Sequence, residues 1–296
     1  MFSAHKIFKH FKLLARRVTP APVVDLLRVI VYIALEPFQE KVATPTGIPA
    51  PPLWRMFDGP RDKQLFLRNS EEAFRLYKVY GKLQPSGHVL DIGSGLGRKT
   101  LSLPEYLGAA GRYVGVDIVR EGVDWCNANI SAKHPNFIFL HLNVHNSRYN
   151  RSATVTAANF QFPFSDQSFD LIVAWSVFTH MFPEDVRNYL REASRMLKPD
   201  GRCVFSFYLM TEGAIAAIQD GTAKEKIEYQ MEESFFTDNK VVPEDLTAFK
   251  ENWIRSAYED ANLSIEEILY GSWVGDGDPK TFPMANYQDI IVAKRT

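Results

Sequence analysis

Short apolar runs alternate with longer amphipathic segments along most of the chain beyond residue 60. The apolar runs predict strands at residues 88–92, 113–117, 137–142, 169–175, 202–208, 263–270 and 288–294. The amphipathic segments predict helices at residues 64–80, 98–107, 121–133, 184–197 and 244–261. Strands that alternate with helices are typical of an α/β domain, so we expect a doubly wound, mostly parallel sheet.

Residues 1–43 follow a different pattern, that of a basic amphipathic helix. Apolar residues fall on one helical stripe, at Ile7, Phe8, Phe11, Leu14, Ala15 and Val18. Residues 1–24 contain no acid, and their Lys and Arg residues are Lys6, Lys9, Lys12, Arg16 and Arg17. Three interpretations stay open: a helix packed on the main domain, a helix lying on an anionic membrane, and an organelle transit peptide.

The same region does not predict a membrane-spanning helix. Its longest apolar run, residues 23–35, is interrupted by Asp25 and Arg28, whereas a spanning helix needs about 20 mostly apolar residues. Prolines are dense between residues 44 and 60 and disfavour helix there. The expected organisation is a helical extension at 1–43, a proline-rich linker at 44–60 and one domain at 61–296.

The composition is that of a folded protein without a strong overall charge. The chain has 296 residues, 46% of them hydrophobic, and 34 Lys and Arg against 35 Asp and Glu give a net charge of -1. These values argue against a disordered chain and against a nucleic acid partner. Cys126 and Cys203 lack the paired spacing of a zinc or redox site, so we expect reduced thiols and no metal.

The first predicted strand of the domain runs through an acid into a glycine-rich turn, Val-Leu-Asp-Ile-Gly-Ser-Gly-Leu-Gly-Arg at residues 89–98. Glycines let the chain turn tightly and let a ligand approach the backbone. The dinucleotide fingerprint is G-x-G-x-x-G, whereas Gly93, Gly95 and Gly97 alternate, which disfavours a nucleotide-dependent oxidoreductase. Asp91 would repel a pyrophosphate but suits a cationic ligand such as S-adenosylmethionine, which carries a sulfonium and an ammonium and no phosphate.

With these motifs the sequence resembles the class I S-adenosylmethionine-dependent methyltransferases. The resemblance rests on residues 89–98, 114–117, 162–164 and 197–201, and it covers residues 86–208 most strongly. It implies a Rossmann-like sheet of seven strands and S-adenosylmethionine as the cofactor.

The resemblance also implies where the methionyl and ribose parts of the cofactor bind. The methionyl end would be held by Asp91 and the loop residues Gly93, Ser94, Gly95 and Gly97. Asp117, followed by Ile118, ends the second strand and would bind both ribose hydroxyls. A carboxylate there can accept two hydrogen bonds, and a helix cap is its alternative role.

The remaining cofactor contacts follow the third and fourth strands. The adenine position falls on Asn143 and Val144, where Asn143 replaces an expected carboxylate and a plain loop asparagine is the alternative. Trp175 and Ser176 would flank the methionyl moiety. His180, four residues further on, is the candidate general base for an acceptor hydroxyl, because its unperturbed pKa lies near neutral pH. Its alternative role is packing or helix capping.

The acceptor is expected to meet residues 143–159 and the long connection 209–243, both of which mix polar and aromatic residues. Residues 176–181, 270–273 and 287–290 resemble a bacterial subgroup associated with glycan or secondary-metabolite modification. We therefore predict methyl transfer to a hydroxyl of a small molecule or glycan, in the cytoplasm. The alternatives are a methyltransferase acting on a membrane lipid or quinone, with peripheral membrane contact through residues 1–35, a cofactor-binding module that has lost catalysis, and the oxidoreductase.

Overall fold

The computed structural model describes residues 29–38, 41–57, 59, 61–275 and 287–296, and the chain divides into two compact units at residues 67 and 68. In the first unit, residues 29–35 are helical and Glu36–Phe38 forms the 3-10 turn η1. The amphipathic stripe predicted for residues 1–28 lies outside the described residues. The three-part division at residues 43 and 60 stays a prediction.

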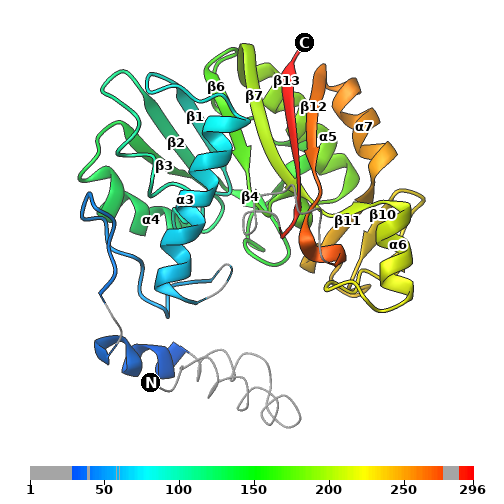
Figure 1. The fold of residues 1–296 in the computed structure, drawn as a ribbon, viewed down its shortest axis with the longest axis horizontal. Coiled ribbons are helices and arrows are strands. Elements are labelled where there is room, and N and C mark those ends of the chain that lie inside the picture. The colour runs from blue at the N-terminus through cyan, green and yellow to red at the C-terminus, as the bar shows by residue number, and fades with distance from the viewer. Residues whose placement is uncertain (1–28, 39–40, 58, 60, 276–286) are drawn as a thin grey trace. The chain divides into compact units, whose positions relative to one another are not determined.

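The second unit is built on one large sheet (Figure 1). Its strands are β1 (His88–Ile92), β2 (Arg112–Asp117), β3 (Phe137–His141), β6 (Phe169–Ala174), β7 (Leu197–Phe207), β12 (Leu263–Leu269) and β13 (Asp289–Arg295). They lie in the order β12-β13-β7-β6-β1-β2-β3. Only β13 runs against its neighbours β7 and β12, and the other pairs are parallel. The prediction of a doubly wound, mostly parallel, seven-stranded sheet is confirmed.

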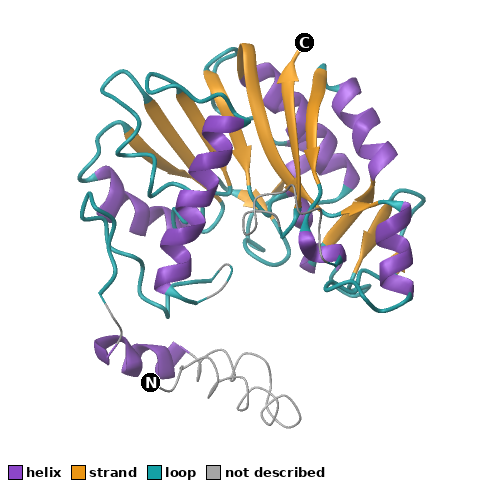
Figure 2. Ribbon diagram, in the orientation of Figure 1, coloured by secondary structure: helices purple, strands orange, loops and turns teal. Residues whose placement is uncertain are grey.

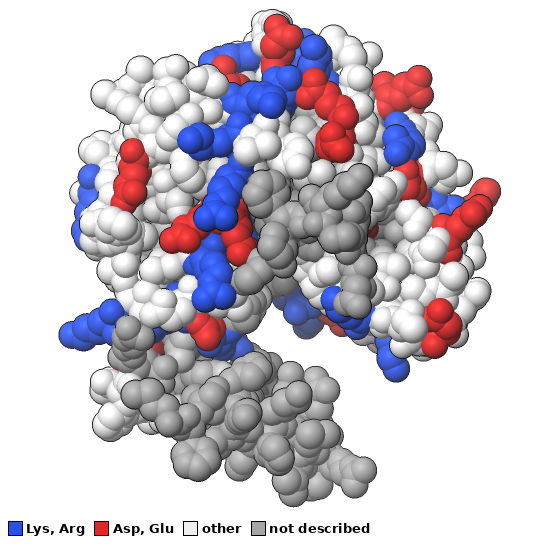
Figure 3. All heavy atoms as spheres, in the orientation of Figure 1, with Lys and Arg blue, Asp and Glu red and all other residues white. Residues whose placement is uncertain are grey.

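Helices flank this sheet (Figure 2). They are α3 (Lys63–Val79), α4 (Arg120–Cys126), α5 (Pro183–Met196) and α7 (Glu251–Asp260), whereas α6 (Glu212–Gln219) lies apart, next to strands of a smaller sheet. In the view of Figure 1, α3 crosses in front of the sheet and α5 lies behind it. Figure 3 shows Lys and Arg side chains in a line over α3, which exposes Arg68, Arg75 and Lys78. The inner strands β1, β2, β6 and β13 are buried along most of their length, which explains their near-continuous apolar sequence, whereas the edge strands β3 and β12 expose several residues.

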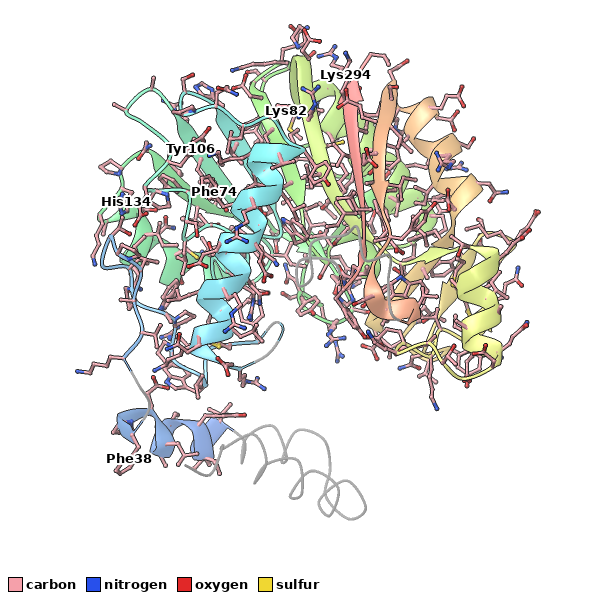
Figure 4. All side chains as sticks on the ribbon, viewed as in Figure 1. Phe38, Phe74, Lys82, Tyr106, His134 and Lys294 are labelled. Atoms are coloured by element: carbon pink, nitrogen blue, oxygen red, sulfur yellow. The ribbon has the colours of Figure 1, made fainter. Side chains whose placement is uncertain are left out.

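The prediction of a helix at residues 98–107 is wrong. The segment is a series of turns, with hydrogen bonds from the Thr100, Leu103 and Tyr106 amides to carbonyls three residues earlier. Pro104 explains the difference, because proline has no amide hydrogen and its ring clashes with the preceding helical turn. Tyr106 still packs edge-on against Phe74 of α3, with ring centroids 5.0 Å apart (Figure 4).

The helix predicted at residues 244–261 begins too early. Residues 243–245 form a 3-10 turn, η5, and Thr247–Lys250 forms strand β11 before α7 starts at Glu251. β11 belongs to a second sheet with β8 (Leu209–Met210), β9 (Tyr229–Gln230) and β10 (Phe235–Thr237), in the order β8-β11-β10-β9. The predicted long connection at 209–243 is therefore largely folded. Stacking of Phe249 on Phe235 and Trp253 favours the strand over a helix.

A buried carboxyl joins the two sheets. Asp289, at the start of β13, is 1% exposed and accepts hydrogen bonds from the Leu209 amide at 2.7 Å, the Gly271 amide at 2.7 Å and Trp273 Nε1 at 2.8 Å. The side chain thus fixes β8 and the 3-10 turn η6 (Ser272–Val274) against the large sheet.

We expect Asp289→Ala to lower the free energy of unfolding by about 3 kcal/mol, because it leaves three buried donors without an acceptor. Urea denaturation measures the change. The matched control is Asp200→Asn, which removes an exposed 3.5 Å ion pair with Lys294. That variant should lose less than about 0.5 kcal/mol. A similar effect in both variants would contradict the role of Asp289.

Candidate active site

The glycine-rich loop turns back from β1 onto the end of β2. The amides of Gly93 and Ser94 both donate to the Val116 carbonyl, at 2.8 and 3.1 Å. Gly93 and Gly97 have φ angles of 77° and 74°, in the left-handed region. A Cβ on Gly93 would overlap Val177, and one on Gly97 would lie 2.8 Å from Ile130 Cδ1. Glycine is therefore required at both positions by conformation and by space.

Asp117 holds this loop in place. Its Oδ2 accepts a hydrogen bond from the Gly95 amide and its Oδ1 one from the Val119 amide, both at 2.7 Å. Val119 precedes the first residue of α4, so the carboxyl also supports the turn into that helix. Each carboxyl oxygen can accept a further hydrogen bond. The structural role therefore coexists with room for a ligand diol.

Asp91 is buried beneath the loop. Its Oδ2 accepts a 2.6 Å hydrogen bond from the Tyr113 hydroxyl, which is itself 2.6 Å from Thr100 Oγ1. Burial raises the pKa of Asp91 to about 7; the Tyr113 hydrogen bond and the Lys99 charge act in the opposite direction. An acid that titrates near neutral pH in the ligand-free protein would be stabilised in its ionised form by a bound cation.

Trp175, just after β6, is placed by residues that the sequence did not indicate. Its Nε1 donates to the Tyr77 hydroxyl of α3 at 2.7 Å, and Lys99 Nζ lies 4.7 Å from its ring centroid. Tyr77 is separated from Trp175 by 98 residues, so only the folded chain reveals the contact.

Ser176, which follows β6, is hydrogen-bonded to residues of the neighbouring strand β7 and of the segment before β13. Its side chain is exposed, and its backbone has a φ angle of 56°, in the left-handed region. Its amide donates to Ser206 Oγ at 2.8 Å. Its hydroxyl donates to Gln288 Oε1 at 3.0 Å. A non-glycine residue in this conformation is held there by its surroundings, which is common at functional sites.

The residues predicted for the adenine position differ in what they offer. Asn143 is exposed and its Oδ1 accepts a 3.2 Å hydrogen bond from Asn150 Nδ2. The Val144 side chain is 2% exposed and belongs to the core, and Ile118 is partly buried against the same core. Because the Val144 side chain is in the core, only the backbone of this residue could contact a ligand.

His180 lies in the 3-10 turn η4 (Phe178–His180), beyond Ser176. Its Nδ1 is 2.9 Å from the Glu244 carbonyl oxygen. A carbonyl oxygen only accepts, so Nδ1 carries the proton and Nε2 carries the lone pair. Burial lowers the pKa of His180 below the usual 6.5, against a smaller opposite effect of the Glu244 carbonyl. The imidazole is therefore neutral at pH 7. In the described part of the chain no cluster of three His, Cys, Asp or Glu could hold a metal.

Residues 90–205 match the sequence model of a family described as a methyltransferase domain. The matched segment runs from β1 to β7 and contains the glycine-rich loop. Two curated relatives overlap it: an arsenite methyltransferase of Aquipseudomonas alcaligenes, 35% identical over 40% of this chain and 32% of its own length, and an uncharacterized methyltransferase of Bacillus subtilis, 30% identical over 48% of each chain. The chain thus spans about a third to a half of the curated relatives it matches.

Solved structures share the fold of the methyltransferase domain. A protein from Pyrococcus horikoshii aligns with a TM-score of 0.53 at 17% identity, over 80% of this chain and 93% of its own. A SAM-dependent methyltransferase from Methanosarcina mazei aligns with a TM-score of 0.50 at 19% identity, over 74% and 96%. These structures confirm the predicted fold, and the family match supports the prediction of a methyltransferase that uses S-adenosylmethionine.

The residues around the loop fit S-adenosylmethionine. Ser94 Oγ is buried without a hydrogen-bond partner among the described residues, and it adjoins the glycines that keep the loop free of side chains. Two acids lie at the loop: Asp91 ends the strand beneath it and Asp117 accepts the Gly95 amide. A buried orphan hydroxyl and two acids suit a cationic ligand with a ribose diol.

We expect the affinity for S-adenosylmethionine to rise about tenfold between pH 6 and pH 8 through Asp91 alone. Below its pKa of about 7 the carboxyl is protonated, and a bound cation must first displace that proton. Above it, the carboxyl is already ionised. Isothermal titration at pH 6, 7 and 8 measures the change.

The matched control is Asp91→Asn, which keeps the acceptor for Tyr113 and cannot ionise. Dividing wild-type affinity by variant affinity removes the titration of the cofactor's own amine. A ratio that does not change with pH would show that Asp91 does not titrate on binding.

Proposed function

We propose that this protein transfers a methyl group from S-adenosylmethionine to a hydroxyl of a small molecule or glycan. The observation that carries the proposal is the state of His180, a neutral imidazole whose Nδ1 proton is held by the Glu244 carbonyl. This imidazole stands three residues after Val177, whose side chain abuts Gly93 of the loop, and it can accept a proton through Nε2.

The cofactor contacts in this proposal are those predicted from the sequence. Asp91 and the loop residues Gly93, Ser94, Gly95 and Gly97 bind the methionyl end, with Trp175 and Ser176 beside it. Asp117 accepts hydrogen bonds from the ribose, and Ile118, Asn143 and Val144 surround the adenine. When bound, S-adenosylmethionine supplies an electrophilic methyl group on a sulfonium.

The chain's part in the reaction is to align the acceptor and remove its proton. A hydroxyl loses its proton when its oxygen forms the new bond, and His180 Nε2 is the acceptor for that proton. Because burial lowers the pKa of His180, the base is available at neutral pH. Alignment of the two reactants supplies a large share of the rate in such a displacement.

The surroundings of His180 favour a polar acceptor. The Tyr149 ring packs edge-on against the imidazole, with centroids 5.7 Å apart, and the Arg148 guanidinium lies 5.2 Å from the Tyr149 centroid. Asn143 and Asn150 lie before and after these two residues, and their side chains are hydrogen-bonded to each other. Aromatic faces interleaved with amides and a guanidinium suit a hydroxyl-rich ligand.

The arsenite activity of one relative is not what we propose here. Arsenite is thiophilic, and both cysteines of this chain, Cys126 and Cys203, are buried and free. Burial also raises the pKa of Cys203, which opposes formation of a thiolate.

We expect His180→Ala to lower turnover by about 10² to 10⁴ with cofactor affinity nearly unchanged, because the loss falls on the transition state. Single-turnover methyl transfer measures it, with an acceptor found by labelling cell extract from radioactive cofactor. In the wild type the rate should rise with pH through a midpoint below 6.5 and then level off.

The matched control is His134→Ala, which removes a histidine whose pKa is also lowered by burial and which lies in the turn before β3. This variant should keep the wild-type rate. If His180→Ala keeps both the rate and its pH profile, His180 is not the base.

A second candidate acceptor is a membrane lipid or quinone, and the first unit favours it. Residues 30–38 expose large apolar side chains: Ile30 is 52% exposed, Ile33 50% and Phe38, labelled in Figure 4, 83%. The preceding residues 1–24 are basic and free of acids. Apolar and basic residues together are typical of segments that lie on anionic membranes. Among the helices described, none has the length and apolarity to cross a bilayer.

For this second candidate, the full-length protein should float with vesicles containing phosphatidylglycerol at low salt and lose most of that binding at high salt, since each basic residue near the surface contributes about 1 kcal/mol. A triple variant, Ile30→Ser, Ile33→Ser and Phe38→Ser, should stay in solution. The control is Val241→Ser, at a position 89% exposed in the second unit. Equal flotation with neutral and anionic vesicles, or none with either, would reject the membrane surface.

A further inference from the structure

Three segments that are distant in sequence meet around His180. The segment at 146–149 follows β4 (Val144–His145), η4 follows β6, and η5 follows β10. Asn146 Nδ2 donates to the His180 carbonyl at 3.3 Å and to Glu244 Oε1 at 3.1 Å. We call Asn146, Ser147, His180 and Glu244 the histidine clamp.

Glu244 is the residue on which the histidine clamp converges. Its side chain is buried, and its Oε2 accepts hydrogen bonds from the Ser147 amide at 3.2 Å and from the Ser147 hydroxyl. With Asn146 on Oε1, the carboxyl therefore has three donors, all uncharged. No Lys or Arg ion pair of Glu244 occurs within the described residues. A buried carboxyl with neutral donors needs all of them to offset its desolvation.

The backbone of the same residue contacts the imidazole. The Glu244 carbonyl oxygen accepts from His180 Nδ1 at 2.9 Å, so the side chain anchors the segment whose main chain orients the histidine. Thr247 Oγ1, three residues later, donates to the Phe178 carbonyl at 3.0 Å and fixes the same two segments a second time. The position of the Glu244 carbonyl thus depends on where its carboxyl is bonded.

We propose that Glu244 is a positioning residue: by holding the turn at Asn146 and Ser147, its carboxyl keeps its own carbonyl on His180 Nδ1 and fixes Nε2 as the basic nitrogen. The catalytic consequence rests on the proposed role of His180 as base. The tautomer itself does not, and it can be measured without an acceptor substrate.

The test is Glu244→Gln, which keeps the size of the side chain but replaces one acceptor oxygen by an amide that faces other donors. Nitrogen-15 NMR of the full chain labelled at histidine distinguishes protonated from unprotonated ring nitrogens. The His180 signals are identified among those of the 7 histidines by their absence in His180→Ala. We expect the wild type to hold the Nδ1-protonated form and Glu244→Gln to populate the Nε2-protonated form substantially.

The matched control is Asp245→Asn. It removes the charge of the neighbouring side chain, which pairs with Arg148 at 3.5 Å and acts on His180 through space, and it leaves the hydrogen bonds within the histidine clamp intact. Its His180 tautomer should match the wild type. If Glu244→Gln does not fold, Ser147→Ala removes one donor and should give a smaller shift in the same direction.

Activity provides the second readout. Glu244→Gln should lower kcat about tenfold and leave the affinity for S-adenosylmethionine within twofold, whereas a merely structural defect would lower the amount of folded protein and keep the tautomer. A wild-type tautomer in folded Glu244→Gln overturns the proposal. If the tautomer shifts while His180→Ala keeps full turnover, the positioning role stands and the proposed base is wrong.

Discussion

The hydrogen bond from the Gly95 amide to the Asp117 carboxyl is the contact on which the rest of the site depends. A loop with three glycines at positive φ has many conformations open to it, and this bond selects one by attaching the loop to the end of β2. The second oxygen of the same carboxyl orders Val119 at the entry to α4. Further along that helical segment, the π-helix η2 (Asn127–Ser131) brings Ile130 against Gly97. One carboxyl therefore sets the strand end, the loop and the covering helix together.

The protein buries several acidic side chains, and these differ in the number and kind of their hydrogen-bond donors. Asp289 accepts hydrogen bonds from two backbone amides and one indole, and these bonds connect the two sheets. Asp91 is bonded by the hydroxyls of Tyr113 and Thr100, and burial raises its pKa to about 7 in spite of them. An acid left with fewer donors than it can use destabilises the ligand-free fold at high pH, and this is the physical basis for its attraction of a cation.

The inner strands were predictable because burial on both faces leaves them as short apolar runs, as in β1, β2, β6 and β13, whereas the edge strand β12 mixes apolar and acidic residues. The segment at 98–107 shows the limit, since apolar spacing alone did not account for Pro104. At the candidate site, Asp91 and the glycines stand in one sequence motif and Asp117 ends the next strand, so the sequence alone could propose them. Tyr77 and Glu244 could not be predicted in this way. Tyr77 lies in a segment that has only the pattern of an ordinary amphipathic helix, and its partner Trp175 is 98 residues away. Glu244 contacts residues that are 64 to 98 residues away in the sequence.

The place of β13 between β7 and β12 has a consequence for how the protein matures during synthesis. Gln288, the residue before this strand, accepts the hydroxyls of Ser176 and Ser206. While the ribosome still holds residues 288–295, β7 lacks its neighbour and Ser176 lacks the partner that helps to hold its left-handed backbone. The nascent chain can therefore assemble the glycine loop and β1 to β6 early, but Ser176 acquires its bond to Gln288 only after β13 has inserted. A partly made chain would hold the glycine-rich loop before the turn that follows β6 is fully ordered.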